Sequence, residues 1–324
     1  MAQAVVLTGP GGPEKLEWQE VDVPAPGAGE VRLKQTAIGI NFIDVYHRTG
    51  LYPLTYPAIL GMEAAGVVEA VGEGVQSLKT GDRVTYVGHG PGAYATARLI
   101  KAEYLVPIPK NVGDEEAAAL MLKGLTAQFL LTRCFPVKAG QVVVIHAAAG
   151  GVGLLLCQWA KHLGATVIGA VGSDDKARLA AQNGCDYPIN YTNEKVSARV
   201  REITNGAGAD VVYDSVGQAT FMDSLDCLKP LGMMVSFGQA SGKIPPFDIS
   251  LLASKGSLFL TRPSLMHYIA DTAAYRQAGK ELLELAGRGV LKAHIDRRLS
   301  LREAAQAHRL LESRATSGSL VLTP

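Results

Sequence analysis

The sequence predicts an α/β protein in which a doubly wound parallel sheet is inserted in a β-rich, barrel-like domain. Up to about Asn111 the chain consists mainly of short strand-like runs separated by turn residues, which is typical of a compact β domain. From Gln141 strands and helices alternate, and this rhythm requires a parallel sheet that helices cover on both faces. Leu320–Leu322 is again strand-like, so we expect the chain to return to the first domain.

The expected elements follow these patterns in order. In the first domain we expect strands at 1–7, 31–37 and 63–72, and another after the turn at 81–84. A helix is expected from Glu115 to Phe135, where Pro136 ends it. The strands of the parallel sheet are expected at 141–147, 165–171, 187–190, 210–214, 233–237 and 257–261. The first domain should then comprise residues 1–120 and 264–324, and the second residues 121–263.

The composition is that of a globular protein with little net charge. The 324 residues are enough for two domains, and 48% of them are hydrophobic, so a sizeable core is expected. The formal net charge is +1 and basic residues form no stripe, which argues against a nucleic-acid surface. No apolar run reaches the length of a membrane span, and the N-terminal run lacks the charged start of a signal peptide. We therefore expect neither a nucleic acid nor a membrane as partner.

The cysteines are scattered along the chain. Cys134, Cys157, Cys185 and Cys227 form no Cys-x-x-Cys pair, and the seven histidines form no cluster. This spacing argues against a structural zinc site and against a disulfide framework. We expect each cysteine to be a small buried residue in a reducing compartment, which indicates a cytoplasmic protein.

The pattern that points most directly to a function is a strand, a turn of small residues and a helix. The apolar run Val142–His146 leads into the turn Ala147–Gly153, and a helical run follows. This order of elements binds a dinucleotide pyrophosphate, because main-chain amides at the helix start point at the phosphates. Ala148 stands where the first glycine of the fingerprint is usual, and a small residue still permits the turn. We expect the pyrophosphate to be held by Gly150, Gly151, Val152 and Gly153.

The end of the next strand indicates which dinucleotide binds. A site specific for NAD places an acidic residue there to accept hydrogen bonds from the ribose hydroxyls. This chain has Gly172, which leaves room for a 2′-phosphate, followed by Ser173 as a hydrogen-bond donor and Lys176 as a positive charge. The same residues also fit a helix start with Ser173 as N-cap. We expect NADPH rather than NADH, with Asp174 and Asp175 directed away from the phosphate.

Six motifs distributed over nearly the whole chain resemble one family. They are Asn41–Pro53, Gly61–Val68, Met121–Ala127, Ala147–Gly153, Asp210–Gly217 and Leu311–Gly318. In these motifs the chain resembles the zinc-independent quinone oxidoreductases of the medium-chain dehydrogenase/reductase superfamily, such as zeta-crystallin and the bacterial NADPH:quinone reductases. The resemblance implies a Rossmann domain inserted in a GroES-like catalytic domain, with NADPH in a cleft between them.

The resemblance also implies roles for residues outside the glycine turn. Contacts to the adenosine and its 2′-phosphate are implied for Ser173, Lys176, Tyr191 and Arg314. Contacts to the ribose or the nicotinamide are implied for Ser215, Val216, Phe237, Gly238 and Gln239, and contacts to the phosphates or ribose for Lys123 and Thr126 near the start of the linking helix. The walls of the nicotinamide and acceptor pocket are implied to be Asn41, Ile43, Asp44, Tyr46 and Tyr52.

The reaction that the resemblance implies is reduction of an electron-poor acceptor, a quinone above all. Tyr46 and Tyr52 can stack on a flat acceptor and donate to its carbonyl oxygen, so with Asn41 they are the candidate catalytic residues. Hydride or electron transfer from the nicotinamide C4 needs no strong general acid, because water can protonate the delocalised anion that forms. Related alcohol dehydrogenases have a zinc-binding His where this chain has Met62, so zinc catalysis is not expected. We expect Glu63 to be paired with a nearby donor instead.

Two other functions fit the same patterns. A reductase of 2-alkenals or enones would use the same fold and cofactor and would send hydride to the β-carbon of an alkene. The second is a non-catalytic protein that binds NADPH or RNA, although the low net charge argues against RNA. The apolar runs 232–237 and 257–261 further predict a homodimer, because they can extend a sheet across a two-fold axis.

Overall fold

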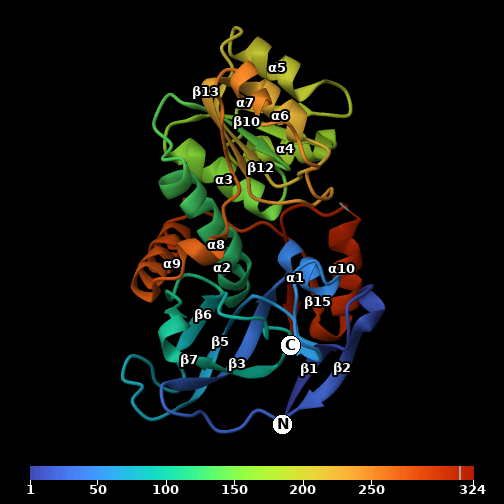
Figure 1. Cartoon of the computed structure of the whole chain (residues 1–324). Coiled ribbons are helices and arrows are strands. Elements are labelled where there is room, and N and C mark those ends of the chain that lie inside the picture. Colours follow the sequence, from blue (N-terminus) through green and yellow to red (C-terminus); the bar gives the residue numbers. More distant parts are fainter. Residues whose placement is uncertain (314) are drawn as a thin grey trace. The chain divides into compact units, whose positions relative to one another are not determined.

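The computed structural model describes residues 1–313 and 315–324, and these form two units. Unit 1 consists of Met1–Leu125 and Ile269–Pro324, and unit 2 consists of Thr126–Tyr268. One continuous segment of chain therefore forms unit 2 and separates the two segments of unit 1, which is the insertion that the sequence predicts (Figure 1).

Unit 2 contains a six-stranded parallel sheet, which confirms the doubly wound fold. Its strand order is β11-β10-β9-β12-β13-β14, and every neighbouring pair is parallel. The order reverses at β9 and β12, and open α/β sheets bind ligands at such a point, outside the carboxyl ends of the strands. The strands are β9 (Val142–His146), β10 (Thr166–Val171), β11 (Tyr187–Asn190), β12 (Ala209–Asp214), β13 (Leu228–Ser236) and β14 (Phe259–Thr261).

All six predicted strands are present, and one of them is longer than predicted. β13 starts at Leu228 rather than at residue 233, because Leu228 already pairs with Ala209, and the register then shifts where β13 has extra residues between Leu228 and Met233. The helices of unit 2 are α3 (Gly151–His162), α4 (Asp174–Gln182), α5 (Val196–Ile203), α6 (Phe221–Cys227), α7 (Ser250–Ser254) and α8 (Leu265–Tyr268).

Successive residues of β12 show that both faces of this sheet are covered. Val212 packs in a core cluster with Val200 of α5 and Leu225 of α6. The next residue, Tyr213, points to the opposite face, as alternation in a strand requires. There its hydroxyl donates to the carbonyl of Leu130, 3.2 Å away.

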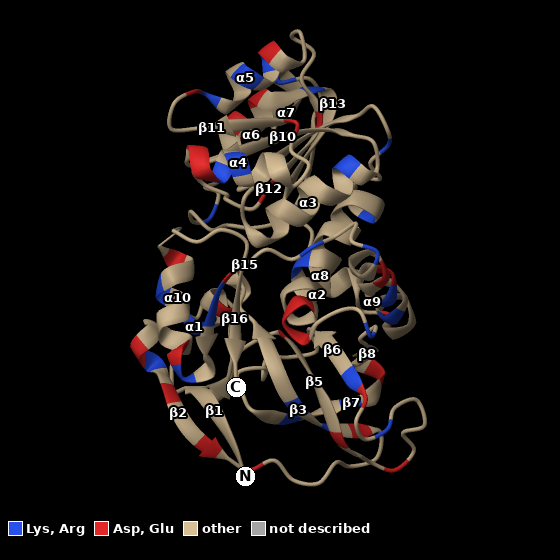
Figure 2. Cartoon of the chain, turned by 180° about the vertical axis from the view of Figure 1, so that it is seen from behind, with Lys and Arg blue, Asp and Glu red and all other residues tan. Residues whose placement is uncertain are grey.

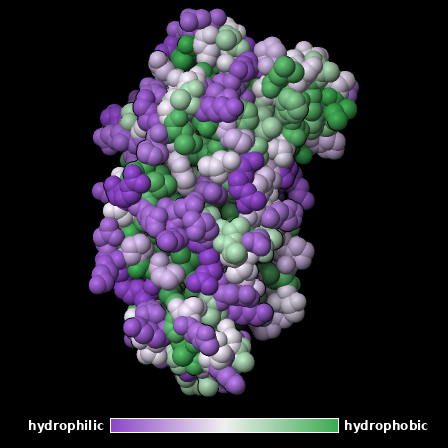
Figure 3. Space-filling model, turned by 90° about the vertical axis from the view of Figure 1, so that its left-hand side faces the viewer, coloured by the Kyte–Doolittle hydropathy of each residue, from purple (hydrophilic) through white to green (hydrophobic). Residues whose placement is uncertain are grey.

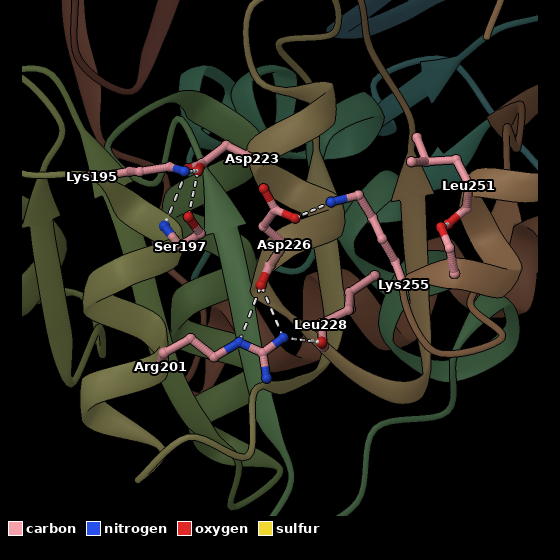
Figure 4. Close-up of polar contacts among 9 residues, drawn as sticks. Lys195, Ser197, Arg201, Asp223, Asp226, Leu228, Leu251 and Lys255 are labelled. Atoms are coloured by element: carbon pink, nitrogen blue, oxygen red, sulfur yellow. Dashed lines mark hydrogen bonds and ion pairs between the residues drawn. The ribbon is translucent and has the colours of Figure 1, made fainter. Parts of the chain in front are cut away.

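Polar contacts fix α6 against α5 and the start of β13 (Figure 4). The Arg201 guanidinium donates to the carbonyl oxygens of Asp226, at 3.0 and 3.2 Å, and of Leu228, at 2.7 Å. Ser197 donates its hydroxyl to Asp223 at 2.5 Å. Lys255 forms an ion pair with Asp226. These contacts anchor the helix whose first turn carries Phe221, which lies at the carboxyl edge of the sheet.

The helix predicted from Glu115 to Phe135 changes type before its end. α2 (Asp114–Phe129) is α-helical, and Leu130–Cys134 continue as a π-helix. The amide of Phe135 donates to the Leu130 carbonyl at 3.1 Å, five residues back instead of four. The Tyr213 hydroxyl donates to the same carbonyl. The predicted helix is therefore confirmed over nearly its whole length, and its last turn is a π-helix that the hydroxyl of the distant Tyr213 supports.

Unit 1 contains two sheets with mostly antiparallel pairing. A three-stranded sheet has the order β2-β1-β4, and a seven-stranded sheet has the order β15-β16-β3-β5-β6-β8, with β7 on β3. The strands are β1 (Ala2–Leu7), β2 (Leu16–Val21), β3 (Glu30–Gly39), β4 (Ala58–Ile59), β5 (Glu63–Val71), β6 (Arg83–Val87), β7 (Ala97–Lys101), β8 (Val106–Pro107), β15 (Ile295–Ser300) and β16 (Ser319–Thr323). The predicted strands of this domain are thus confirmed, including the C-terminal strand that returns to it.

Helices surround these sheets. They are α1 (Phe42–Arg48), the first part of α2, α9 (Thr272–Gly287) and α10 (Ala304–Glu312), with 3-10 turns at Pro13–Lys15, Ala102–Tyr104 and Leu301–Glu303. Acidic and basic residues lie side by side on α4 and α9, in keeping with the low net charge (Figure 2). Among the described residues, the helices are all too short or too polar to cross a membrane.

Candidate active site

The turn between β9 and α3 places main-chain amides at an uncapped helix start. Gly150 is the N-cap residue of α3 and has no side chain with which to cap it. Its own amide donates to the Ala147 carbonyl at 2.8 Å, and its carbonyl accepts the Leu154 amide at 2.9 Å. The amides of Gly151, Val152 and Gly153 belong to the first turn, whose N–H groups have no partner within a helix. The positive end of the helix dipole lies at the same place, so this turn suits a phosphate.

Close packing explains why glycine occupies position 153. A Cβ atom there would lie 2.2 Å from the Ala147 carbonyl oxygen and 2.8 Å from the Ala148 Cα. At position 150 the nearest atom to such a Cβ is the Ala147 oxygen, at 3.1 Å. Gly153 is therefore required for the helix to approach the turn, whereas position 150 has more room. Ala148 is fully buried in this turn, so the departure from the usual glycine is accommodated.

The residues predicted to hold a 2′-phosphate come together at the ends of β10 and β11. A Cβ at Gly172 would lie 2.5 Å from the Tyr191 hydroxyl, so that hydroxyl covers the end of β10. Ser173 caps α4 by accepting the amide of Lys176 at 3.3 Å, which confirms the predicted N-cap. Tyr191 is 55% exposed, and Lys176 is partly exposed on the first turn of α4.

The two acidic residues of this turn have other partners. Asp174 accepts a hydrogen bond from the Asn190 side chain at 2.7 Å, and Asp175 forms an ion pair with Arg178. Arg178 offsets the negative charge of Asp175, and the neutral Asn190 amide holds the Asp174 carboxylate by a hydrogen bond. The fourth residue predicted here, Arg314, lies outside the described residues.

A buried carboxylate organises the loop that follows β12. Asp214 accepts hydrogen bonds from the amides of Val216, at 2.7 Å, and Gly217, at 3.0 Å. It also accepts from the hydroxyls of Thr220, at 2.6 Å, and Ser224, at 2.9 Å. Because all four donors converge on one side chain, the loop is held in a single conformation. Sequence reasoning placed this loop at the cofactor and did not identify Asp214 as its anchor.

The loop after β13 packs directly on the loop after β12. A Cβ at Gly238 would lie 2.4 Å from the Ser215 carbonyl oxygen. The amide of Ala240 donates to the same carbonyl at 3.2 Å, and the amide of Ser241 donates to Val216 at 2.8 Å. The structure therefore brings together the predicted group Ser215, Val216, Phe237, Gly238 and Gln239.

In unit 1, Asn41 and Asp44 form the start of α1. Asn41 is the N-cap, and its amide donates to the Asp44 carboxylate at 2.9 Å in a capping box. Asp44 is fully buried, and its Oδ1 atom has no partner among the described residues. Burial raises the pKa of the Asp44 carboxyl to about 7, against the lowering effect of hydrogen bonds from Asn41 and Tyr94. One of the residues predicted to wall the acceptor pocket is therefore a buried carboxyl group with a pKa near neutrality.

A buried ion pair lies beside this helix start. The Lys123 ammonium lies 3.0 Å from the Glu63 carboxylate and 3.2 Å from the Ile40 carbonyl oxygen. Glu63 also accepts from the Asn41 side chain at 2.8 Å and from the Leu122 amide at 2.6 Å. The expectation of a paired Glu63 is confirmed. Lys123 lies in the second half of α2 rather than near its start, and its charged atom is bound within unit 1.

A chain of buried polar groups extends from Asp44 and was not predicted. Arg48 can only donate hydrogen bonds, so His308 accepts with Nδ1 at 3.5 Å and carries its proton on Nε2. That Nε2 donates to the Tyr94 oxygen at 3.0 Å, and the Tyr94 hydroxyl donates to Asp44 at 3.2 Å. Burial and the nearby Arg48 lower the pKa of His308 to about 3, which keeps the imidazole neutral. This series of hydrogen bonds fixes the position of the Asp44 carboxyl group.

The two predicted acceptor tyrosines lie next to each other. The ring centroids of Tyr46 and Tyr52 are 5.3 Å apart and the rings meet edge to face at 63°. The amide of Tyr52 donates to the Tyr46 carbonyl at 3.0 Å. Both side chains are partly exposed, as is Ile43. An exposed aromatic corner of this kind can stack on a flat ring.

The cysteines form no disulfide bond and differ in burial. All four cysteines are free thiols, and Cys134 is only half-buried, in contrast to the prediction.

Thr126, the last of the predicted cofactor contacts, is 7% exposed near the end of α2. Within the described part of the chain, His, Cys, Asp and Glu side chains form no group of three that could hold a metal ion.

Two parts of the chain match known protein families. Residues 27–110 match the family described as "Alcohol dehydrogenase GroES-like domain", and residues 151–286 match the family described as "Zinc-binding dehydrogenase". These ranges cover much of unit 1 and most of unit 2.

Full-length relatives carry names of oxidoreductases. A quinone oxidoreductase of Pseudomonas aeruginosa is 48% identical, with 100% of both chains covered. A 2-haloacrylate reductase of a Burkholderia species is 47% identical, with 100% of this chain and 99% of that protein covered. The crystal structure of Escherichia coli quinone oxidoreductase complexed with NADPH has a TM-score of 0.97 and 45% identity, with 100% of both chains covered.

Proposed function

Because the chain belongs to the quinone oxidoreductase family of the medium-chain dehydrogenase/reductase superfamily, we propose that it reduces quinones with NADPH. The chain is an oxidoreductase, and unit 2 is its dinucleotide-binding domain, whereas unit 1 is its GroES-like catalytic domain. The observation that carries the proposal is the uncapped start of α3 at Gly150–Gly153, which presents three amides to a phosphate.

The choice of NADPH over NADH rests on the end of β10. Gly172 provides no carboxylate to bind ribose hydroxyls, and Lys176 provides positive charge one helical turn away. The carboxylates of Asp174 and Asp175 are engaged by Asn190 and Arg178, which supports an orientation of both carboxylates away from a 2′-phosphate. Tyr191 covers this end of the strand and is suited to contact the adenosine.

NADPH, when bound, supplies a hydride to the acceptor. The protein residues position the acceptor and exclude water from it. Tyr46 and Tyr52 offer an exposed aromatic corner for the acceptor ring and hydroxyls for its carbonyl oxygens. Asn41 supports this corner from the start of α1 and is itself fixed by Glu63. Water protonates the reduced quinone, so no strong acid is needed at the site.

We propose that the reaction needs no zinc. Met62 precedes Glu63 where the alcohol dehydrogenases have a zinc-binding histidine, and a thioether is a poor ligand for zinc. The Glu63 carboxylate is already neutralised by the Lys123 ammonium at 3.0 Å, which disfavours a second cation beside it. Elemental analysis of the purified active enzyme should find far less than one zinc per chain, and turnover should persist after dialysis against a chelator.

A second function is favoured by one relative. The protein named 2-haloacrylate reductase is as similar to this chain as are the quinone oxidoreductases, so reduction of an activated alkene is the alternative. In that reaction the hydride would go to the β-carbon, and a proton would go to the α-carbon. The two functions share the cofactor and differ in the acceptor.

We further propose a homodimer formed at the free edge of the parallel sheet. β14 is the edge strand, and Phe259 on it is 55% exposed. Other large apolar residues of unit 2 are exposed too, among them Met222, Leu231 and Ile249. Figure 3 shows apolar side chains gathered on one part of the surface in that view. Pairing of two β14 edges would cover such a surface.

We also propose a cytoplasmic location. The four cysteines are free thiols, which supports a reducing compartment.

An acceptor panel tests the proposed function. Benzoquinones and naphthoquinones, 2-alkenals and 2-haloacrylates are compared with NADPH and with NADH, and oxidation of the nicotinamide is recorded. We expect the highest kcat/KM for a quinone with NADPH. Faster turnover of an alkene would establish the alternative, and turnover with neither class would refute both.

A further inference from the structure

A pocket of about 600 Å³ lies within unit 2, at the carboxyl ends of β13 and β14. Its apolar wall includes Phe221, Ile244, Phe247 and Leu260. The rings of Phe221 and Phe247 are 4.8 Å apart between centroids and are tilted by 53°. A flat hydrophobic ring system would find van der Waals contact along this wall.

The polar side of the pocket carries positive charge. Lys243 and Arg262 line it, and the lining residues that the structure describes include no carboxylate. The Arg262 guanidinium donates to the Ser236 carbonyl at 2.9 Å, which fixes the charge at the end of β13. Both cationic side chains are exposed, so they form the rim rather than the floor.

Ser236 supplies an independent sign of a missing ligand. Ser236 is one of the residues that line the pocket, it is 2% exposed, and its buried hydroxyl oxygen has no hydrogen-bond partner among the described residues. A buried hydroxyl without a partner costs free energy, and a ligand oxygen in the pocket would remove this cost.

The position of the pocket on the sheet relates it to the redox step. A dinucleotide lies along the carboxyl edge of a doubly wound sheet, with its pyrophosphate at the first strand of the fold, here β9. The nicotinamide half then lies over the strands on the far side of the switch point, which are β12, β13 and β14. Gly238 and Gln239, which are predicted nicotinamide neighbours, also line the pocket.

We propose that this pocket selects the acceptor and that the preferred acceptor is an acidic quinone. The inference rests on the proposed function and names its substrate class. The acceptor's anionic substituent, such as a carboxylate, binds Lys243 and Arg262, and the apolar part of the acceptor next to this substituent lies on Phe221 and Phe247. The Ser236 hydroxyl donates to an acceptor oxygen. The quinone takes a hydride from NADPH and a proton from water to give the hydroquinone and NADP⁺, and the carboxylate is unchanged.

The test compares two acceptors that differ in one charge. 1,4-Naphthoquinone-2-carboxylate and its methyl ester are reduced by the full-length enzyme with NADPH, and kcat and KM are measured for each. The same acceptors are titrated against the enzyme saturated with NADP⁺, which gives a dissociation constant without turnover. The variant is Lys243→Gln. The matched control is Lys138→Gln, an exposed lysine before β9, at the amino end of the same sheet.

We expect the wild-type enzyme to prefer the carboxylate and to lose this preference as salt is added. Lys243→Gln should reduce the carboxylate-to-ester ratio of kcat/KM about five-fold, and the carboxylate should dissociate more readily by a similar factor. Lys138→Gln should leave both ratios as in the wild type. An equal effect of Lys243→Gln on both acceptors, or a ten-fold weaker binding of NADPH itself, would overturn the proposal. If the wild type reduces neither acceptor, the proposed function fails, and the titration still decides whether the pocket binds the carboxylate.

Discussion

The ammonium of Lys123 lies 3.0 Å from the carboxylate of Glu63, and both side chains are buried. Removing one partner of a buried ion pair leaves a charge without compensation, and the cost is about 3–5 kcal/mol. We therefore expect Lys123→Met to lower the free energy of unfolding by about this amount. Urea denaturation followed by circular dichroism measures it.

A double variant and a surface control identify the cause. Adding Glu63→Gln to Lys123→Met should restore much of the lost stability, because no buried charge remains. Lys280→Met removes an exposed ion pair with Glu284 and should change the free energy of unfolding by less than about 1 kcal/mol. Additive losses in the double variant would contradict the pairing.

Close packing at the glycine turn predicts that alanine destabilises the protein at position 153 and not at position 150. Gly153→Ala places a Cβ 2.2 Å from the Ala147 oxygen, which is main chain and cannot rotate away. We expect loss of NADPH binding and a melting temperature lower by several degrees, on the order of 2–4 °C per kcal/mol. In Gly150→Ala the corresponding distance is 3.1 Å, so the melting temperature should be close to that of the wild type. Equal melting temperatures for both variants would show that the turn is not tightly packed.

Lys176 is expected to discriminate between the two nicotinamide cofactors. Lys176→Ala removes the positive charge on the first turn of α4, so NADPH should bind roughly ten-fold more weakly, and NADH should bind nearly as before. Equilibrium titration by nicotinamide fluorescence measures both constants. Lys138→Ala, at an exposed lysine before β9 and at the amino end of the same sheet, is the control and should change neither. Equal weakening of both cofactors by Lys176→Ala would contradict the assigned role.

Asp44 predicts a pH-dependent stability. The pKa of the Asp44 carboxyl is about 7 in the folded protein and 3.8 for an aspartate exposed to water, as in the unfolded chain. Between these two pH values the folded state therefore binds a proton that the unfolded state does not. The contribution of Asp44 to the free energy of unfolding therefore falls as pH rises from about 4 to 7. Asp44→Asn cannot ionise. Relative to the wild type, its stability should rise by about 2–4 kcal/mol between pH 4 and pH 8.

The difference between the two proteins isolates this carboxyl group. His308, whose pKa is lowered to about 3, has the opposite effect on stability, but it is present in both proteins. The groups that face Asp44, namely Tyr94, Glu63 and Lys123, are also unchanged. Urea unfolding at several pH values should give curves that diverge over this range. Parallel curves would mean that Asp44 is ionised throughout.

The edge strand predicts the oligomeric state. Phe259→Asp places a charge on β14, where Phe259 is 55% exposed, and should convert the proposed dimer to a monomer. Light scattering at micromolar concentration measures the mass of both proteins. Tyr187→Asp, at the opposite edge strand β11 with 43% exposure, should leave the mass unchanged. A monomeric wild-type protein would rule out the homodimer.

Features encoded locally were predictable, and features that depend on distant contacts were not. The strand, turn and helix around Gly150–Gly153 lie within one segment, so periodicity and small residues were sufficient. Lys123 and Glu63 are 60 positions apart, and no local pattern shows that they meet. Tyr94 and His308 are separated by 214 positions and meet only because the C-terminal segment returns to unit 1.

The π-helix at the end of the linking helix and the acceptor pocket also depend on distant contacts, so the sequence did not predict them. The sequence from Leu130 to Cys134 continues a helical pattern, and a hydroxyl from Tyr213 supports the wider π-helix. The pocket depends on how the loop carrying Lys243 folds over Phe221, which spacing does not determine.

The most direct test of the central claim is the affinity of the wild-type enzyme for the two cofactors. Isothermal titration with NADPH and with NADH, at one salt concentration, gives both dissociation constants. We predict that NADPH binds at least roughly ten-fold more tightly, because amides at Gly150–Gly153 hold the pyrophosphate and Lys176 holds the extra phosphate. Equal or tighter binding of NADH, or no binding of either, would contradict this account.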